Sequence, residues 1–350
     1  MVFFNGKSNA GGAERMVLYL DEYLQSRGIE TEILDEQFLL NTPGGRLFKK
    51  IFRYRHFAKR KPIYMARFTS AYLYTRARRG QIVISNGEST PFFPVDYVIS
   101  QGCYHSMEKA YGRATDTMSR IAKLQQRGLK MAKHIITVTK SVKEDLIKTY
   151  QLPPEKISIA SNRVDTDYFP ALPKNNPGVR TLVYAGRLEN GKGLEVILKA
   201  AQIIEGSERW NLLIGCNNPG NTELFKDFEK TEIKIGLQLQ NINEELYSRG
   251  DIIIFPSFYE SFGMVTIEAL SAGRPVIATA TGIIPELLER RFPGVYLLPD
   301  VEEGKFLNDL EKMISEFEHN VDLQQLHQLI REEYGIASYR RRLDEVMILN

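Results

Sequence analysis

Short apolar runs alternate along the chain with longer segments in which apolar residues recur at helical spacing. Short apolar runs bounded by turn residues are typical of buried parallel strands. We predict such strands in the runs MVFF, IVIS, YVIS, HIITVT, TLVYAG, WNLLIG, EIKIG and IIIF. The segments between them predict covering helices. The pattern therefore predicts an α/β protein built from parallel sheets.

The strand and helix pattern runs through the chain twice. A chain of 350 residues exceeds the usual size of one domain. The pattern restarts after a stretch rich in proline, asparagine and glycine, 173–178. We predict an N-terminal domain over residues 1–170, a C-terminal domain over 171–335 and a final helix within 336–350. Helical periodicity also predicts a long helix at 107–131, a shorter one at 142–150, and helices at 303–319 and 321–334.

The first segment, VFFNGKSNAGGAERMVLYLDEYLQSRGIETEIL, has the order strand, glycine loop, amphipathic helix and strand, with the helix ending at Gly28. Such a βαβ unit places the helix N-terminus beside the strand end. Gly11 and Gly12 let the backbone approach a ligand there, and the N–H groups of the helix favour a phosphate or a sugar hydroxyl. The alternative interpretation of the double glycine is a plain tight turn.

The stretch FPSFYESFGMVTIEALSAGRP carries two carboxylates around a helix start. The strand IIIF ends at Phe255, and we predict a helix over 263–272, closed by glycine and proline. Glu260 precedes the helix N-terminus, whereas Glu268 lies among apolar residues and is expected to be partly buried. Their spacing suits the two ends of one ligand. The alternative is structural: Glu260 caps the helix and Glu268 forms a salt bridge, with Arg274 as its partner.

A cationic loop follows the strand TLVYAG. Arg187 and Lys192 lie in the glycine-flanked segment GRLENGKG, directly before a predicted helix. Two cations, exposed N–H groups and a helix dipole at one point favour a diphosphate. A loop arginine and lysine alone are more often solvated surface residues. Together with the two glutamates downstream, they predict a phosphorylated ligand.

These motifs resemble those of retaining nucleotide-sugar glycosyltransferases of the GT-B fold, in the family 4-like (glycosyl transferases group 1) set. The resemblance rests on G-R-L followed by K-G, on the E-x7-E pattern of Glu260 and Glu268, and on GGAER near the N-terminus. It implies two Rossmann-like domains facing each other across a cleft, with the C-terminal helix returning to the N-domain. A terminal helix packed on its own domain is the alternative. The crossing KISIASNRVDTDYF resembles the family's N-G-V-D segment, with Arg163 at the glycine position.

The resemblance also implies residue roles: Glu260 at the donor sugar, Glu268 at the ribose, and Arg187 with Lys192 at the pyrophosphate. The implied activity is metal-independent, retaining sugar transfer from a nucleotide-diphosphate sugar, expected to be UDP-linked, to a hydroxyl acceptor without a bound cofactor. The alternatives are a non-catalytic nucleotide-sugar-binding subunit partnering another transferase and a nucleotide-sugar epimerase of the same fold. The implied donor-binding set is Gly11, Gly12, Gly186, Arg187, Lys192, Glu260, Ser261, Phe262, Gly263, Met264, Val265 and Glu268.

Two loops in the N-terminal half follow predicted strands: NGEST after IVIS and QGCYHS after YVIS. Ligands of open parallel sheets bind beyond the carboxyl ends of the strands, where these loops lie. His105 is the first candidate for an acceptor-side catalytic residue, and Glu88 is the alternative. A surface histidine without a role is the other interpretation of His105. His134 begins a predicted strand and is expected to be structural.

Charge adds a strongly basic segment to this picture. The net charge is +3, yet Arg46–Arg79 contains twelve Lys or Arg residues and no acid. Aromatic and aliphatic residues interleave with these cations, which predicts amphipathic helices. We expect the segment to bind an anionic membrane surface carrying envelope or lipid-linked glycan acceptors. The alternatives are a solvated basic face and a groove for an anionic acceptor. No RNA- or DNA-binding motif accompanies the charge, so nucleic acid is not expected.

Cysteine content and hydropathy bear on location. Cys103 and Cys216 fall in different predicted domains and offer neither a disulfide framework nor a zinc cluster. The chain opens without a signal-peptide pattern, and no apolar run approaches the roughly 18 residues that a spanning helix needs. We therefore expect a cytoplasmic protein, peripheral on the inner face of the cytoplasmic membrane.

Overall fold

The computed structural model describes residues 12–51, 61–78, 80–112, 116–172, 178–217 and 219–349. The chain packs as two compact units. The first unit comprises Met1–Asn162 together with Arg340–Asn350, and the second comprises Arg163–Tyr339.

The second unit begins at Arg163, whereas the domain boundary predicted from the sequence falls after residue 170. The crossing segment 163–170 therefore belongs to the second unit. The amide of Val164 donates a hydrogen bond to the carbonyl of Tyr334 over 2.8 Å. The Ser271 hydroxyl donates to the carbonyl of Phe169 over 2.9 Å. These two hydrogen bonds attach the crossing segment to the unit that follows it.

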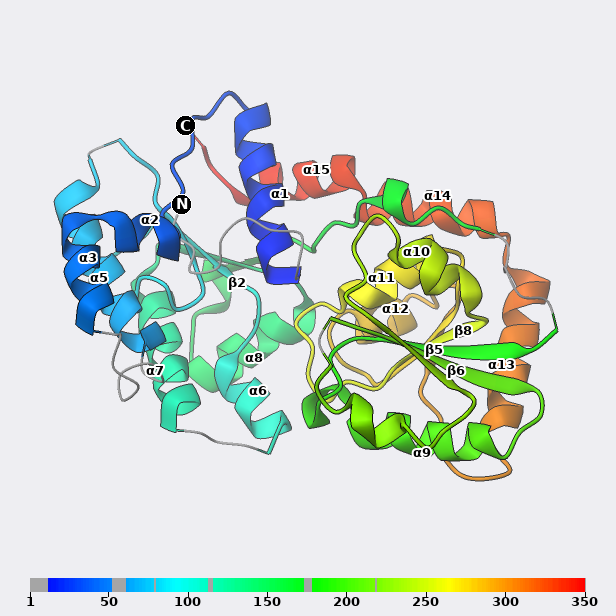
Figure 1. Ribbon diagram of the computed structural model, residues 1–350. Helices are drawn as coiled ribbons and strands as arrows, with labels where there is room; N and C mark the ends of the chain where they lie inside the picture. Colours follow the sequence, from blue (N-terminus) through cyan, green and yellow to red (C-terminus); the bar gives the residue numbers. More distant parts are fainter. Residues whose placement is uncertain are drawn as a thin grey trace. The chain divides into compact units, whose positions relative to one another are not determined.

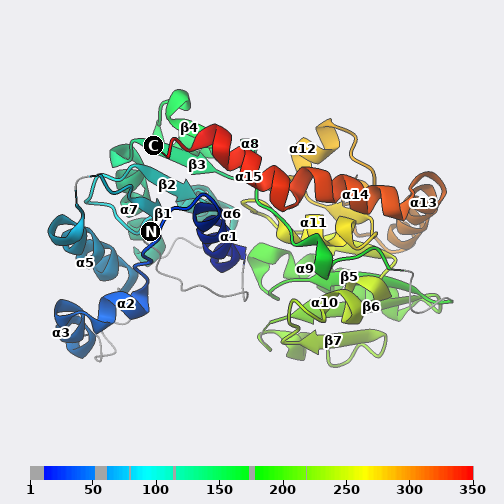
Figure 2. The same ribbon diagram turned by 90° about the horizontal axis from the view of Figure 1, so that it is seen from above.

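The first unit contains a parallel sheet whose four described strands lie in sequence order (Figure 2). These strands are β1 (Ile84–Asn86), β2 (Tyr97–Ser100), β3 (His134–Thr137) and β4 (Ile157–Ile159). The predicted strands IVIS, YVIS and HIITVT are thus confirmed, and MVFF lies outside the described residues. The helices are α1 (Gly12–Ser26), α2 (Glu36–Asn41), α3 (Pro43–Ile51), α5 (Lys61–Arg76), α6 (Tyr104–Ala110), α7 (Asp116–Met131) and α8 (Lys140–Tyr150).

Two predicted elements of this unit are wrong. The single helix predicted over 107–131 is two helices, α6 and α7, because Gly112 adopts a φ of +62°, which an α-helix does not contain. After Gly28 the predicted strand reduces to an isolated bridge residue, Leu34. Leu34 is buried, and strand MVFF, the other strand of the predicted βαβ unit, lies outside the described residues.

The end of the chain packs on the first unit. α15 (Ile336–Val346) belongs to this unit from Arg340 onward. The Tyr23 hydroxyl of α1 donates to Asp344 over 2.8 Å. Beyond the helix, the amide of Ile348 donates to the Tyr97 hydroxyl of β2 over 2.8 Å. The C-terminal helix therefore returns to the unit in which the chain begins.

The second unit contains a six-stranded parallel sheet with the order β10-β9-β8-β5-β6-β7. Its strands are β5 (Arg180–Ala185), β6 (Trp210–Cys216), β7 (Thr231–Ile235), β8 (Ile252–Phe255), β9 (Val276–Ala278) and β10 (Val295–Leu297). Its helices are α9 (Leu194–Glu205), α10 (Ile242–Glu245), α11 (Met264–Ser271), α12 (Ile284–Glu289), α13 (Phe306–Asn320) and α14 (Leu323–Tyr334).

The strand order reverses between β5 and β8. From β5 the chain proceeds outward through β6 and β7, then returns to β8 and continues outward on the other side. Because such crossovers are right-handed, the two halves place their helices on opposite faces. Figure 1 shows α9 on one face and α11 and α12 on the other. The face under α9 forms a buried cluster that includes Leu182, Tyr184, Ile252 and Ile254.

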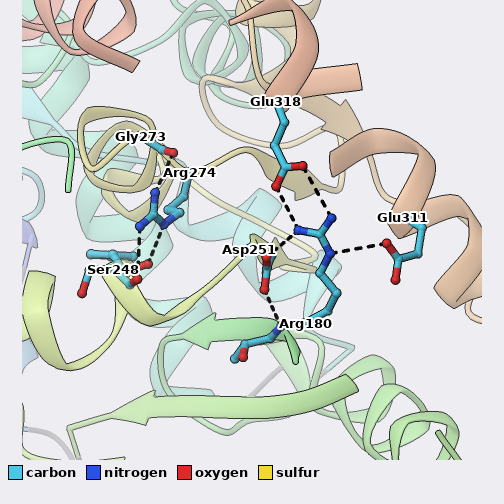
Figure 3. Close-up of polar contacts among 9 residues, drawn as sticks. Arg180, Ser248, Asp251, Gly273, Arg274, Glu311 and Glu318 are labelled. Carbon is cyan, nitrogen blue, oxygen red and sulfur yellow. Dashed lines mark hydrogen bonds and ion pairs between the residues drawn. The ribbon is translucent and has the colours of Figure 1, made fainter. Parts of the chain in front are cut away.

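At the opposite edge, where the strands begin, a charged cluster joins β5, β8 and α13. Arg180 pairs with Asp251 at 2.8 Å, Glu318 at 2.9 Å and Glu311 at 3.4 Å (Figure 3). Asp251 also accepts a hydrogen bond from the amide of Thr181 over 2.7 Å. Hydrogen bonds to Glu318 and then to Asp251 raise the pKa of Arg180. This cluster stabilises the edge away from the site described next.

Candidate functional site

Two charged loops meet at the carboxyl edge of the second sheet. Lys192 ends the short turn η3 (Asn190–Lys192) after β5, and Glu260 lies in the loop between β8 and α11. Lys192 Nζ donates directly to Glu260 Oε1, with 17% and 13% of the two side chains exposed. β5 and β8 are neighbours at the reversal of strand order. The ion pair therefore lies where sheets of this kind bind ligands.

Backbone contacts fix the separation of these two loops. The amide of Phe258 donates to the carbonyl of Gly191 over 3.0 Å. Gly193, at the N-cap of α9, has a φ of +78°, and a Cβ atom there would lie 2.4 Å from the carbonyl oxygen of Pro256. A side chain at Gly193 would suffer both backbone strain and a clash. The close approach of the loops therefore depends on this glycine.

Arg187 lies on the same loop as Lys192 and is more exposed. Its side chain is 57% exposed and pairs with Glu189 over 3.0 Å. Beneath it, the Tyr184 hydroxyl donates to the carbonyl of Arg187 over 2.7 Å. Burial, and then the charge of Glu260, raises the pKa of Tyr184. Tyr184 therefore remains protonated and keeps this hydrogen bond.

Glu268 is buried within α11, with 3% of its surface exposed. This confirms the expected burial. Glu268 Oε2 accepts a hydrogen bond from the Tyr247 hydroxyl over 2.9 Å. The structural alternative, a salt bridge from Arg274 to Glu268, is wrong because Arg274 donates to backbone carbonyls. Figure 3 shows part of this arrangement, whose acceptors are the carbonyl oxygens of Leu172, Tyr247, Ser248 and Gly273.

Glycines shape the start of α11. Gly263, its N-cap, has a φ of +89°. Gly282, after β9, has a φ of +60°, and a Cβ atom there would lie 2.5 Å from the carbonyl oxygen of Phe262. The amide of Ile283 donates to the same oxygen over 2.8 Å. The loop after β9 thus supports the loop that carries Glu260. The other predicted donor residues here are the buried Phe262 and the half-buried Gly186, Ser261, Met264 and Val265.

The first unit joins Glu88 to a tyrosine that was not singled out from the sequence. Glu88 follows β1, is half-buried, and accepts a hydrogen bond from the Tyr104 hydroxyl over 3.2 Å. Burial raises the pKa of Glu88. Gln125 of α7 accepts from the amide of Tyr104 over 3.0 Å and donates to the carbonyl of Gly102 over 2.7 Å. This glutamine fixes the segment that brings Tyr104 to Glu88.

His105 and the N-terminal glycines are not part of this arrangement. The loop QGCYHS is partly helical, since α6 begins at Tyr104, and His105 is exposed in its first turn. Gly11 lies outside the described residues, and Gly12 is the first residue of α1. Of the acceptor-side candidates, only Glu88 therefore combines burial with a described polar contact at a strand end.

The described part of Arg46–Arg79 forms α3 and α5, whereas residues 52–60 and Arg79 lie outside the described residues. On α5, Tyr74 is 64% exposed, and its hydroxyl donates to the carbonyl of Phe92 over 3.0 Å. In the described part of the chain, no helix is both long and apolar enough to cross a bilayer. The exposed residues of α3 include three cations and one leucine that is 64% exposed, namely Arg46, Leu47, Lys49 and Lys50.

Two tyrosines of the second unit were missed in the sequence. Tyr184 supports the loop of Arg187, and Tyr247 contacts Glu268. Both lie in stretches whose other residues suggest ordinary core, so neither attracts a functional interpretation. The available signal is tyrosine in place of phenylalanine at a buried position, because a buried hydroxyl needs a hydrogen-bond partner.

Two family models together match most of the chain: "Glycosyltransferase Family 4" matches residues 10–168, and "Glycosyl transferases group 1" matches residues 168–327. The chain belongs to the family 4-like GT-B glycosyltransferases. The fold of this family recurs in sucrose-phosphate synthase from Thermosynechococcus elongatus, with a TM-score of 0.72, 15% identity and coverage of 98% of this chain and 97% of that one. WaaG, a glycosyltransferase involved in lipopolysaccharide biosynthesis, has a TM-score of 0.68 and 16% identity, covering 99% and 98%.

Curated relatives of this glycosyltransferase chain match over shorter regions. The O-antigen chain mannosyltransferase RfbU of Salmonella typhimurium is 28% identical over 222 residues, which is 59% of this chain and 61% of RfbU. The gpi3 subunit of phosphatidylinositol N-acetylglucosaminyltransferase of Schizosaccharomyces pombe is 24% identical over 221 residues, 61% of this chain and 48% of that subunit. The chain thus spans between 48% and 61% of the length of these two relatives.

Proposed function

We propose that the protein is a retaining, metal-independent glycosyltransferase that moves a sugar from a nucleotide-diphosphate sugar to a hydroxyl group. The observation that carries this proposal is the meeting of Lys192 and Glu260 at the reversal of the second sheet, with Arg187 on the same loop. Relatives support the donor class: Anabaena HepE, with 15% identity and a TM-score of 0.63, is known in complexes with UDP and glucose and with UDP-glucose.

Two cations would stabilise the leaving diphosphate. When the sugar leaves, negative charge develops on the diphosphate, and fixed positive groups lower the barrier. Lys192 and Arg187 supply two cations, and the N-terminus of the 12-residue helix α9 adds backbone amides beside them. These groups take the part that a divalent ion plays in other transferases. EDTA is therefore expected to change the rate by less than about twofold; activity lost to EDTA and restored by Mg²⁺ would contradict this.

The two glutamates would bind the sugar and the ribose of the donor. Glu260 would accept hydrogen bonds from sugar hydroxyls and orient the anomeric carbon, and Glu268 would hold the ribose. A covalent glycosyl intermediate needs a second carboxylate close to the first at the sugar. The proposal assigns only Glu260 there, so the acceptor hydroxyl attacks from the face that the diphosphate leaves. NMR of the product should show a retained anomeric configuration, and inversion would refute this mechanism.

Replacing Glu260 with alanine tests the site. Glu260→Ala is expected to lower turnover by about a thousandfold while nucleoside diphosphate binding persists, because the carboxylate acts on the sugar. Unchanged turnover would refute the assignment. Product analysis separates the alternatives: an epimerase changes the nucleotide sugar without releasing nucleoside diphosphate, and a non-catalytic subunit releases none unless its partner is added. A thermal-shift screen of nucleotide sugars, in which UDP-sugars are expected to stabilise the protein, identifies the donor.

We further propose that the acceptor is an envelope or lipid-linked glycan reached at the inner face of the cytoplasmic membrane. On α3, the exposed Arg46 and Lys50 flank the exposed Leu47, and Lys49 adds a third exposed cation to the same helix, a combination suited to anionic lipid. RfbU is an O-antigen chain mannosyltransferase and WaaG takes part in lipopolysaccharide biosynthesis, and both point to the same acceptor class. Liposome flotation should show binding that needs anionic lipid and weakens with salt. Binding to a soluble anionic polymer but not to liposomes would favour the anionic-acceptor groove.

A further inference from the structure

The ion pair joins two residues to which the proposed function gives different parts of the donor. Lys192 is assigned to the diphosphate and Glu260 to the sugar, yet each is the other's partner in the structure. A phosphate arriving at Lys192 must either displace the carboxylate or lie beside it against like-charge repulsion. In both cases Glu260 opposes the binding of an anion at this point.

The exchange of partners requires side-chain motion only. The loops are held together by the hydrogen bond from Phe258 to Gly191 and by the contact of Gly193 with Pro256. Lysine and glutamate are both long side chains with several rotamers. With the backbone fixed, Glu260 can leave Lys192 by rotation about its own bonds while the loops keep their positions.

We propose that Glu260 is an internal competitor of the donor diphosphate for Lys192. The β-phosphate of the donor takes Lys192 and releases Glu260 to the sugar hydroxyls, which become its new partners. After transfer, the nucleoside diphosphate no longer offers a sugar, so Glu260 returns to Lys192 and weakens product binding. This inference rests on the proposed function and extends it to discrimination of donor from product.

The chain supplies a matched control on the same loop. Arg187 and Glu189 also form a cation–carboxylate pair, but their side chains are 57% and 39% exposed, against 17% and 13% for Lys192 and Glu260. Water screens the exposed pair and weakens it. Removing the Glu189 charge is therefore expected to have much less effect on phosphate binding than removing the Glu260 charge.

Calorimetric titration of full-length variants tests the proposal with UDP, GDP and ADP and their monophosphates. Glu260→Gln is expected to bind the cognate nucleoside diphosphate about fivefold to tenfold more tightly, with the monophosphate unchanged, because the competitor is removed. Glu189→Gln should change the affinity by less than about twofold. In a Lys192→Met background the gain from Glu260→Gln should vanish, because it acts through Lys192. Glu260→Asp, which keeps the charge on a shorter side chain, should give an intermediate gain.

Three results would overturn the inference. These are a Glu260→Gln affinity equal to or below that of the wild type, an equal gain for the monophosphate, and a gain that persists in Lys192→Met. Thermal unfolding of each variant confirms that it is folded before titration. If no nucleoside diphosphate binds the wild type, the proposed function itself is overturned. That outcome is distinct from diphosphate binding that Glu260 does not influence.

Discussion

The carboxyl edges of the two parallel sheets hold their polar residues in different ways. In the second unit, two loops from neighbouring strands are joined through their backbones, and Gly193 permits the contact. In the first unit, Glu88 and Tyr104 are joined through side chains, with Gln125 fixing the segment between β2 and α6. One edge is defined by backbone geometry and the other by side-chain hydrogen bonds.

This difference matches what each edge is proposed to bind. The diphosphate group is the same in every nucleotide-diphosphate sugar, so a site made of backbone contacts and fixed cations suits all of these donors. Acceptors differ from enzyme to enzyme, and side chains on loops can be replaced without rebuilding a sheet. We therefore expect the second edge to be common to related transferases and the first edge to set the specificity of this one.

The largest expected effect comes from adding a methyl group to the backbone-defined edge. Gly193→Ala combines a left-handed backbone with a Cβ atom 2.4 Å from a carbonyl oxygen, and should lower the free energy of unfolding by about 3 kcal/mol or more. Gly87→Ala in the first unit has a φ of +52° but nothing within 4 Å, and should cost about 1 kcal/mol. Urea unfolding of both variants measures this. If both variants lose the same free energy of unfolding, the close backbone contact at Gly193 does not distinguish the two edges.

A second, smaller effect is expected from the phenol beneath Glu268. Tyr247→Phe leaves the buried carboxylate without a hydrogen bond of 2.9 Å and should weaken nucleoside diphosphate binding by about tenfold. Tyr104→Phe removes a similar phenol–carboxylate bond in the first unit and should leave nucleotide binding unchanged. Titration calorimetry of the two variants compares them. Equal weakening would place Tyr104 or its neighbours at the donor.

A third prediction concerns the pH dependence of the first unit. Burial raises the pKa of Glu88 above its usual value of 4.5. From pH 4.5 upward the folded state therefore holds more protons than the unfolded state, and stability falls as the pH rises through this window. Glu88→Gln should remove that fall, and should also lower turnover if Glu88 accepts the acceptor's proton. Thermal unfolding and rates measured from pH 4 to pH 8 test both.

His105→Gln is the matched control for Glu88→Gln. Because His105 is exposed, its replacement should change turnover by less than about twofold. A collapse of activity in His105→Gln, with Glu88→Gln active, would reverse the ranking of the two candidates.

The smallest effect is expected at His134. Its Nε2 lies 2.9 Å from the Ser158 hydroxyl, and burial, then the charges of Lys143 and Lys156, lowers its pKa below 6.5. Below pH 6.5 the unfolded state takes up the proton first, so stability falls as the pH falls. His134→Gln should flatten this slope without changing stability above pH 7. If stability still falls with pH as steeply in His134→Gln as in the wild type, other groups cause the loss of stability at acidic pH.

Much of the second unit was predictable because its motifs are local. The spacing of apolar residues predicts the strands and helices. Lys192 and Glu260 both follow the ends of strands, and a parallel sheet brings the ends of its strands to one edge. Their direct pairing was not predictable, since it depends on β5 and β8 being neighbours despite the strands between them in sequence. The Tyr247 partner of Glu268 was not predictable either, because the structural alternative favoured the opposite charge of Arg274, whose guanidinium donates to backbone carbonyls.

The first unit was less predictable because its decisive features are not periodic. Gly112 interrupts a pattern that is helical on both sides, and its left-handed backbone leaves no mark in hydrophobic spacing. The loop after YVIS makes His105 the first acceptor-side candidate, but its exposure depends on where α6 begins. The contact of Tyr104 with Glu88 depends on the pairing of β1 with β2, which brings the Tyr104 hydroxyl to the carboxylate.

Arg274 has a consequence for how the second unit loses its structure. Its guanidinium binds carbonyls at Leu172, at Tyr247 with Ser248, and at Gly273, and Leu172 is 102 residues away in sequence. It acts as a non-covalent cross-link that closes a long loop of chain through hydrogen bonds to backbone carbonyls. Loss of any one segment leaves a buried cation poorly solvated, which raises the free energy of partly opened forms. The unit that carries the proposed donor site should therefore open cooperatively, with the crossing segment and the α11 helix released together.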